Sequence, residues 1–455
     1  MFGLLVVVVG ALAALAGVPA TSAVPARLHR ADPWTSVSDV LHAGVVDHAF
    51  PGAVALVVNK TATMYSNAVG AFTYGLPPPF SQGNPAMHSD AKFDLASLTK
   101  VLATTTATMT FYQRGELQLD ELVSSDRLLG APYAQNGKGP IKVLNLLLHN
   151  SGYPPDPYPG YWSKAFACPA TQQRDPPEVF TCQSQIFTAL MKQTLENPIG
   201  KKYVYSDLSM ITMMYVVGTL ARRLNYISQA QVRPDCLAGV DVSSISDTAH
   251  PVDQCYYEAY VRKFVIERLN LDHTGFLPPK NEWGNCVPTW NDTTPDAPGP
   301  GYRNRVIQGQ VSDQNAYALG GIAGHAGLFS TAGDIAVLTR RILFAEHGDD
   351  FVNKTTAHKF TTAYNLTQSS RALGWDTNNY QMNTYRGCAN LSSTTFTHTG
   401  YTGTEVCNDP ERGIITVLLT NRVYPKADDE SEAKIHAYRQ KFNNAVRAVV
   451  DAMWA

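Results

Sequence analysis

The sequence predicts an α/β fold of the α+β type, with one antiparallel sheet built from both chain ends and a mostly helical domain inserted between them. Alternating strand patterns occur near the start, in GAVALVVNK and ATMYSNAVGAF, and return near the end in TTFTHTG, TEVCNDP and IITVLLTNRV. The sequence between these two strand regions has helical periodicity. Because neither strand region is large enough alone, we expect residues 34–95 and 332–455 to form one sandwich and residues 96–331 the helical domain.

The chain begins with an apolar run, FGLLVVVVGALAALAGV, which leads into Pro19 and the small residues ATSAV. This pattern predicts a signal peptide over residues 1–23, cleaved after Ala23, and a secreted or extracellular protein that could also reside in a lumenal compartment of the secretory pathway. The run carries no Lys or Arg, so an uncleaved anchor is the alternative. No later segment looks like a spanning helix, and we expect no membrane span in the mature chain.

A helix is the first element predicted after the apolar run. PWTSVSDVLHAGVVDHAFPG predicts an amphipathic helix that ends before a Pro-Gly turn, and the two N-terminal strands come next. Helices are then predicted in LTKVLATTTATMTFY, IKVLNLLLH, QIFTALMKQTL, LSMITMMYVVGTLARRL and YEAYVRKFVIERLN, separated by Pro-, Gly- and Asp-rich loops. After the three C-terminal strands, residues 432–454 form a last amphipathic helix.

Composition excludes several classes of function. With 455 residues, 44% hydrophobic residues and a formal net charge of −2, the chain can bury a large core, and it has no Lys/Arg-rich run to bind nucleic acid. It contains no phosphate-binding G-x-x-x-x-G-K-[ST], no G-x-G-x-x-G after a strand and no H-E-x-x-H. We therefore expect no cofactor, no metal and no nucleic-acid partner.

The seven cysteines suit an oxidising compartment. Neighbours in sequence can pair, which leaves Cys286 alone, although other connectivities are open; the local pairs are Cys168–Cys182, Cys236–Cys255 and Cys388–Cys407. Sequons would be glycosylated if the chain passes through a eukaryotic secretory pathway, and they lie at Asn59, Asn291, Asn353, Asn365 and Asn390.

The stretch FDLASLTKV contains the pattern S-x-x-K, with Ser97 and Lys100 about one helical turn apart, so the amine can reach the hydroxyl. A second copy, Ser431 to Lys434, lies in an acidic run where helix capping explains it. Three further stretches accompany the first copy: Tyr205-Ser206-Asp207 before an apolar helix, His398-Thr399-Gly400 on a strand, and the Gly-rich turn GHAGLFSTAGD.

Together FDLASLTK, LLLHNSGYP, YSDLS, GHAGLFST and HTGYTGT resemble the serine β-lactamase and penicillin-binding-protein superfamily, specifically its class C branch with related DD-peptidases and esterases. The motifs occur in that family's order, and the likeness covers about residues 37 to 450. The resemblance implies a helical domain on an α/β sandwich, with the active site between them.

The resemblance also implies roles. Ser97 is the expected nucleophile that forms an acyl-enzyme, Lys100 its proton acceptor, Tyr205 a group that moves protons, and Asp207 a third polar group near Lys100. The backbone N–H groups of Ser97 and Tyr401 are expected to form the oxyanion hole. His398, Thr399 and Gly400 would lie along the substrate.

Two departures from the family pattern concern charge. Penicillin-recognising members commonly have Asn at the position of Asp207 and Lys at the position of His398. A carboxylate near Lys100 favours the ammonium form and shifts the work of a base toward Tyr205. A histidine carries a full positive charge only at lower pH, so it is a poorer anchor for a substrate carboxylate. Both changes point away from an efficient β-lactamase.

Structural explanations exist for each of these residues. Ser97 and Asp207 could be helix caps, Tyr205 a core tyrosine and His398 a satisfied strand histidine. Two further histidines are interpreted as structural, His149 at a helix end and His325 in its turn.

The sequence thus predicts a secreted serine hydrolase that acts through a Ser97 acyl-enzyme on a small-molecule or peptide substrate, namely an ester, an amide or a D-amino-acid peptide. The enzyme alternative is a DD-carboxypeptidase or β-lactamase. The non-enzyme alternative is a catalytically silent binding module that retains the pocket. The oligomeric state is not predicted.

Overall fold

The computed structural model describes residues 32–169, 179–241, 245, 248–292, 303–380 and 387–455. The predicted signal peptide lies outside these residues. A six-stranded antiparallel sheet has the order β2-β1-β9-β8-β7-β6, so the central neighbours β1 and β9 come from opposite chain ends, as predicted. Its strands are β1 (Gly52–Val58), β2 (Thr63–Gly70), β6 (Asp376–Thr377), β7 (Phe396–Thr399), β8 (Glu405–Asp409) and β9 (Ile414–Thr420).

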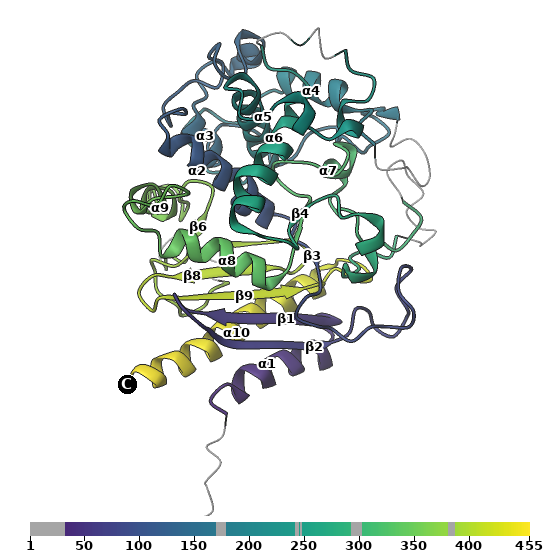
Figure 1. Ribbon diagram of the computed structural model, residues 1–455, viewed down its shortest axis with the longest axis vertical. Helices are drawn as coiled ribbons and strands as arrows, with labels where there is room; N and C mark the ends of the chain where they lie inside the picture. Colours follow the sequence, from purple (N-terminus) through teal and green to yellow (C-terminus); the bar gives the residue numbers. More distant parts are fainter. Residues whose placement is uncertain (1–31, 170–178, 242–244, 246–247, 293–302, 381–386) are drawn as a thin grey trace, which may run out of the picture.

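Helices cover both faces of this sheet. The terminal helices α1 (Thr35–Val46) and α10 (Asp429–Trp454) pack side by side beneath it, and α8 (Ala332–Leu343) lies on the face toward the helical part (Figure 1). The central strand β1 is buried along its whole length because alternate residues enter two different cores. Ala53, Ala55 and Val57 join the core with α1 and α10, while Val54, Leu56 and Val58 join the other core.

The helical part surrounds α5 (Asp207–Arg223), which is buried along most of its length and packs against α6 (Asp253–Val261). Gly218 allows this packing, because a Cβ there would collide with the backbone of Asp253. The other α-helices among the described residues of this part are α2 (Thr106–Gln113), α3 (Val143–Leu147), α4 (Gln183–Lys192) and α7 (Gln314–Ala318), and α9 (Lys354–Thr361) follows α8 in the chain.

A second, three-stranded sheet with the order β3-β5-β4 joins the two parts of the molecule. It consists of β3 (Phe93–Asp94), β4 (Gly275–Phe276) and β5 (Leu328–Ser330). The sequence does not predict these strands, because two or three residues are too few to show alternation. This sheet matters for function, since β3 leads directly into Ser97.

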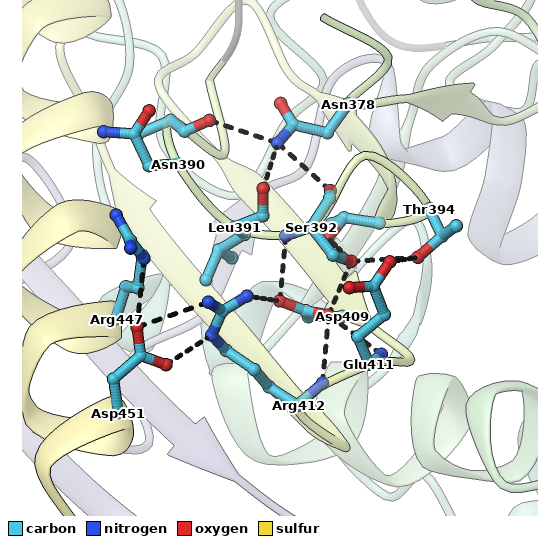
Figure 2. A network of polar contacts seen from close by, with 12 residues as sticks. Asn378, Asn390, Leu391, Ser392, Thr394, Asp409, Glu411, Arg412, Arg447 and Asp451 are labelled. Atoms are coloured by element: carbon cyan, nitrogen blue, oxygen red, sulfur yellow. Dashed lines mark hydrogen bonds and ion pairs between the residues drawn. The ribbon is translucent and has the colours of Figure 1, made fainter. Parts of the chain in front are cut away.

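The three predicted disulfides, Cys168–Cys182, Cys236–Cys255 and Cys388–Cys407, are confirmed, and Cys286 is a buried free thiol. Near the third disulfide, a polar network fixes the β8–β9 hairpin to α10 (Figure 2). Buried Asp409 accepts hydrogen bonds from Ser392 and pairs with Arg412, whose guanidinium also binds Asp451 of α10. Among the described residues, no helix combines the length and apolarity needed to cross a bilayer.

Candidate active site

Ser97 is half-buried in the turn between β3 and the following helix. The residue before it, Ala96, has a φ of 46°, a left-handed conformation that is costly for a residue with a Cβ. Buried Asp94 holds this turn, because its carboxylate accepts hydrogen bonds from Ala96 N at 2.9 Å and from Ser312 N at 2.6 Å. These hydrogen bonds join the turn before Ser97 to the segment at Ser312, and so they hold Ser97 at one position.

Lys100 is fully buried and binds three oxygens. Its Nζ donates to Ser97 Oγ at 2.8 Å and to the His325 carbonyl at 3.0 Å, and it forms an ion pair with Asp207 Oδ1 at 2.7 Å. Burial by itself would lower the pKa of this amine, but the Asp207 carboxylate and the Tyr205 hydroxyl outweigh burial and raise the pKa above its usual value. Lys100 is therefore an ammonium at neutral pH, as the Asp207 departure implies.

Asp207→Asn is expected to lower the pKa of the Lys100 amine, because the substitution removes the main charge that stabilises the ammonium. The ammonium, which places a positive charge beside Ser97 Oγ, then loses its proton at lower pH. The alkaline limb of the pH profile of kcat/KM is expected to move to lower pH, measured against the wild type at constant ionic strength. An unmoved limb would show that Asp207 does not control the titrating group.

The start of α5 positions two of the predicted residues. Ser206, not Asp207, caps the helix, since its Oγ accepts from Ser209 N at 3.3 Å. Asp207 is the first helical residue and is free to face Lys100. The ring of Tyr205 lies 4.9 Å from Lys100 Nζ and 4.9 Å from the ring of His149.

His149 fixes this helix start, because its Nδ1 accepts a hydrogen bond from Ser206 N at 3.1 Å. The sequence suggested only a structural histidine at a helix end. In the structure, His149 supports Ser206, the residue between Tyr205 and Asp207.

Near Lys100 lies a second pair, buried His325 and partly exposed Asp313, that the sequence did not predict. His325 Nε2 is 3.0 Å from Asp313 Oδ1, and single ligand atoms of Asp207, Asp313 and His325 all lie within 4.8 Å of one another. Burial lowers the pKa of His325, but the carboxylates of Asp207 and Asp313 outweigh burial and raise the pKa. The three side chains have the chemistry of metal ligands, yet here Asp207 faces the Lys100 ammonium and Asp313 faces the His325 ring.

The turn after β7 is clamped by two arginines. Arg439 of α10 donates from Nη2 to the carbonyls of Gly400 and Thr404, both at 2.9 Å. Arg422 donates from Nε to the Tyr401 carbonyl at 2.8 Å. These bonds fix the orientation of the peptide units that carry the predicted oxyanion donor, the Tyr401 N–H.

The same turn is tied to the strand before Ser97. Thr402 Oγ1 donates to Asp94 O at 2.7 Å and Thr404 Oγ1 donates to Leu95 O at 3.0 Å. Gly400 is required here, because a Cβ would collide with the Leu95 carbonyl. The predicted nucleophile and the predicted oxyanion donor on Tyr401 thus belong to one hydrogen-bonded unit.

Glu405 lies just beyond this turn, 1% exposed, and accepts a hydrogen bond from Asn443 Nδ2 at 2.8 Å. Burial raises the pKa of Glu405 to about 7, against the opposing effect of Arg439.

Since the folded-state pKa of Glu405 is raised, the folded protein loses stability relative to the unfolded chain as pH rises from about 4.5 to about 7. We expect Glu405→Gln to remove about 3 kcal/mol of this pH dependence in the free energy of unfolding. Denaturant unfolding of both proteins at pH 4.5 and pH 8 measures the difference. If the free energy of unfolding changes by the same amount between pH 4.5 and pH 8 in both proteins, Glu405 is not the titrating group.

His398 is buried on β7, and its Nδ1 lies 2.8 Å from the Thr399 carbonyl. Burial lowers the pKa of His398 well below its usual value, and the charges of Arg371 and Lys100 lower it further. His398 is therefore neutral at physiological pH and does not supply the positive charge that a lysine supplies in penicillin-recognising members.

Arg371 provides a positive charge beside His398, and no sequence motif indicated it. The residue is 8% exposed, and its Nε donates to the Tyr203 hydroxyl at 3.1 Å. An Nη2 ion pair with Asp376 is longer, at 3.6 Å. Arg371 Nη1 is buried without a hydrogen-bond partner among the described residues, although a buried charged donor needs one.

Ser97 and Tyr205 lie where two cavities meet. One cavity, of about 270 Å³, is lined by Arg371, His398 and Gly400 as well as Ser97 and Tyr205. The other, of about 480 Å³, is lined by Asp207, Trp290, Ile307, Ser312 and Asp313 as well as Ser97 and Tyr205. A substrate that places its reactive carbonyl at Ser97 can extend into a cavity on each side.

Comparisons with known proteins give the family of this chain. The family model described as Beta-lactamase matches residues 37–440. A protein of Escherichia coli K12 named "Putative D-alanyl-D-alanine carboxypeptidase" is 28% identical over 448 residues, covering 94% of this chain and 90% of its own. An N-acetylmuramyl-L-alanine amidase of Bacillus subtilis is 28% identical over 428 residues, covering 89% of this chain and 86% of its own.

Solved structures have the same fold at low sequence identity. EstCE1, a hydrolase with promiscuous acyltransferase activity, superimposes with a TM-score of 0.62 at 18% identity, covering 90% of this chain and 98% of its own. A class C β-lactamase superimposes with a TM-score of 0.60 at 14% identity, covering 91% of this chain and 98% of its own. On the extent of the family match and the shared fold, the chain belongs to the β-lactamase family of serine hydrolases.

Proposed function

We propose that this protein is a secreted serine hydrolase that acts through a Ser97 acyl-enzyme on an ester, an amide or a D-amino-acid peptide. The observation that carries the proposal is the 2.8 Å hydrogen bond from buried Lys100 Nζ to Ser97 Oγ at the meeting point of two cavities. Such a pair activates a hydroxyl that is otherwise a weak nucleophile.

In the first step, Ser97 Oγ forms a bond to the substrate carbonyl carbon and loses its proton. Because Lys100 is held as an ammonium by Asp207, we assign the proton transfer to Tyr205, whose ring lies beside Lys100. The Tyr205 oxygen takes up the Ser97 proton as its own hydroxyl proton passes to the leaving group and the carbonyl–heteroatom bond breaks. Water repeats the sequence in reverse and releases the acyl group as a carboxylic acid.

The negative charge that develops on the carbonyl oxygen requires donors placed in advance. We assign these to the backbone N–H groups of Ser97 and Tyr401. The clamped turn from Gly400 to Thr404 supports this assignment, because it fixes Tyr401 relative to the strand that precedes Ser97. The Lys100 ammonium adds a positive charge next to Ser97 Oγ.

Arg371 favours a second candidate function, a carboxypeptidase. Its side chain lines the smaller cavity, and a carboxylate on the leaving group would satisfy its buried Nη1. Curated relatives named as D-alanyl-D-alanine carboxypeptidases are consistent with such a substrate. A β-lactam carboxylate could occupy the same place, although Asp207 and His398 depart from the penicillin-recognising pattern.

We include location and organisation in the proposal. The N-terminal apolar run and the disulfides support secretion, and secretion in a eukaryote would lead to glycosylation at the sequons. We propose that residues 34–95 with 332–455, and residues 96–331, form two domains, because Ser97 and Tyr205 then come from one side of the site and His398 from the other.

The test is intact mass spectrometry of the mature protein after exposure to a fluorophosphonate and, separately, to a small activated ester. Wild type is expected to gain one adduct, and Ser97→Ala none. Ser431→Ala is the matched control, since Ser431 occupies the other S-x-x-K pattern and accepts within the α10 cap. A folded wild type without an adduct would favour the silent binding module.

A further inference from the structure

The orientation of His398 fixes what its ring offers to a ligand. Nδ1 lies 2.8 Å from the Thr399 carbonyl oxygen, which can only accept, so Nδ1 carries a hydrogen and donates it. A neutral imidazole has one N–H. Nε2 of His398 therefore carries a lone pair and is an acceptor.

This acceptor belongs to a side chain that lines the site. Nε2 is buried and has no hydrogen-bond partner among the described residues, and the side chain lines the smaller cavity together with Ser97 and Tyr205. The residue is only 4% exposed, so solvent does not readily satisfy it.

Charges on the surrounding elements keep the ring neutral. Arg371 lies on the segment before β6, Lys100 after β3 and Arg439 on α10, and each disfavours a second proton on His398. The Thr399 carbonyl acts in the opposite sense. Because burial, the largest cause, and the three cations all disfavour a second proton on His398, Nε2 keeps its lone pair over the physiological pH range.

Within one cavity, Arg371 thus presents a donor and His398 an acceptor. A leaving group of the form –NH–CHR–COO⁻ has the complementary pair, an N–H next to the scissile bond and a carboxylate one carbon further. The corresponding ester, –O–CHR–COO⁻, has the carboxylate but brings an oxygen lone pair toward Nε2. Two facing lone pairs repel, and the buried acceptor remains unsatisfied.

We propose that His398 Nε2 accepts a hydrogen bond from the N–H of the scissile amide, so that the site selects amides over the isosteric esters. The inference rests on the proposed function, and it gives His398 a role in specificity in place of the anion anchor that the sequence suggested. Tyr205 approaches the other side of the leaving nitrogen as proton donor.

The test uses two substrates that differ by one atom group, N-acetyl-D-alanyl-D-alanine and N-acetyl-D-alanyl-D-lactate. The ratio of kcat/KM for the peptide to that for the ester is measured in wild type, His398→Leu and His398→Gln. Loss of the acceptor in His398→Leu is expected to lower the ratio by about 10- to 100-fold, the range for an unsatisfied buried partner. His398→Gln offers a carbonyl acceptor and is expected to recover part of it.

His347→Leu makes the same substitution at an exposed histidine and is expected to keep the wild-type ratio. Equal ratios in wild type and His398→Leu overturn the inference. If turnover is too slow, titration calorimetry with Ser97→Ala compares binding of the two compounds, and equal affinities, or no binding of either, overturn it as well. Fluorophosphonate labelling of Ser97 separates the cases, because it is retained if only the role of His398 is wrong.

Discussion

Lys100→Met is expected to lower kcat/KM by about 10²- to 10³-fold, the range for losing one preorganised donor that stabilises developing negative charge. The variant removes the hydrogen bond to Ser97 Oγ and the positive charge beside the reacting oxygen. It also leaves Asp207, whose side chain is only 16% exposed, without its cation. Breaking such a buried pair costs about 3–5 kcal/mol of stability, so activity and unfolding must be measured on the same preparation.

The double variant Lys100→Met/Asp207→Asn separates the two effects. Without the Asp207 carboxylate, no unpaired charge is buried, so the free energy of unfolding is expected to return toward the wild-type value. Activity is expected to stay low, because the group that binds Ser97 Oγ is still absent. If the double variant regains both stability and activity, Lys100 has only a structural role and the proposed mechanism is wrong.

Charge balance explains why the site tolerates two carboxylates so near the nucleophile. Asp207 faces Lys100 and Asp313 faces His325, and these groups lie close enough to influence one another. The arrangement stabilises a cationic lysine and so favours Tyr205 as the group that moves the proton. A negative charge that forms on Ser97 Oγ then meets an ammonium already in place.

Local spacing made part of this site predictable. Ser97 and Lys100 are three residues apart, and the geometry of a helix brings them into contact whatever the rest of the fold does. Pairing of the two chain ends in one sheet was predictable as well, because their strands are long and alternate clearly. The short strand β3 was not, since its order comes from pairing with β5, more than 200 residues away.

Contacts between distant segments account for what the sequence did not reveal. Arg371 stands in a loop without a motif, and only the fold brings it to Tyr203, 168 residues away. The His325–Asp313 pair depends likewise on how the Gly-rich turn folds back beside Lys100. The sequence showed that His398 lacks the positive charge of the lysine found in penicillin-recognising members. It did not show that Arg371 lies beside His398.

Arg371→Met is expected to lower kcat/KM about 100-fold for substrates whose leaving group carries a carboxylate, because a charge-assisted hydrogen bond and its desolvated partner are lost together. The C-terminal amide of the same peptide has no carboxylate, and its kcat/KM is expected to change far less. Comparing the two substrates in one variant cancels any general effect on folding or on Ser97.

Arg371→Lys sharpens this comparison. Lysine keeps the positive charge but cannot reproduce the planar fork that binds Tyr203 and still directs Nη1 into the cavity. We expect it to recover only part of the preference for the carboxylate substrate. An equal loss of kcat/KM for both substrates in Arg371→Met would instead mean that Arg371 supports Tyr203 and Tyr205 structurally. The carboxypeptidase hypothesis would then lose the one contact that favours it over a general esterase.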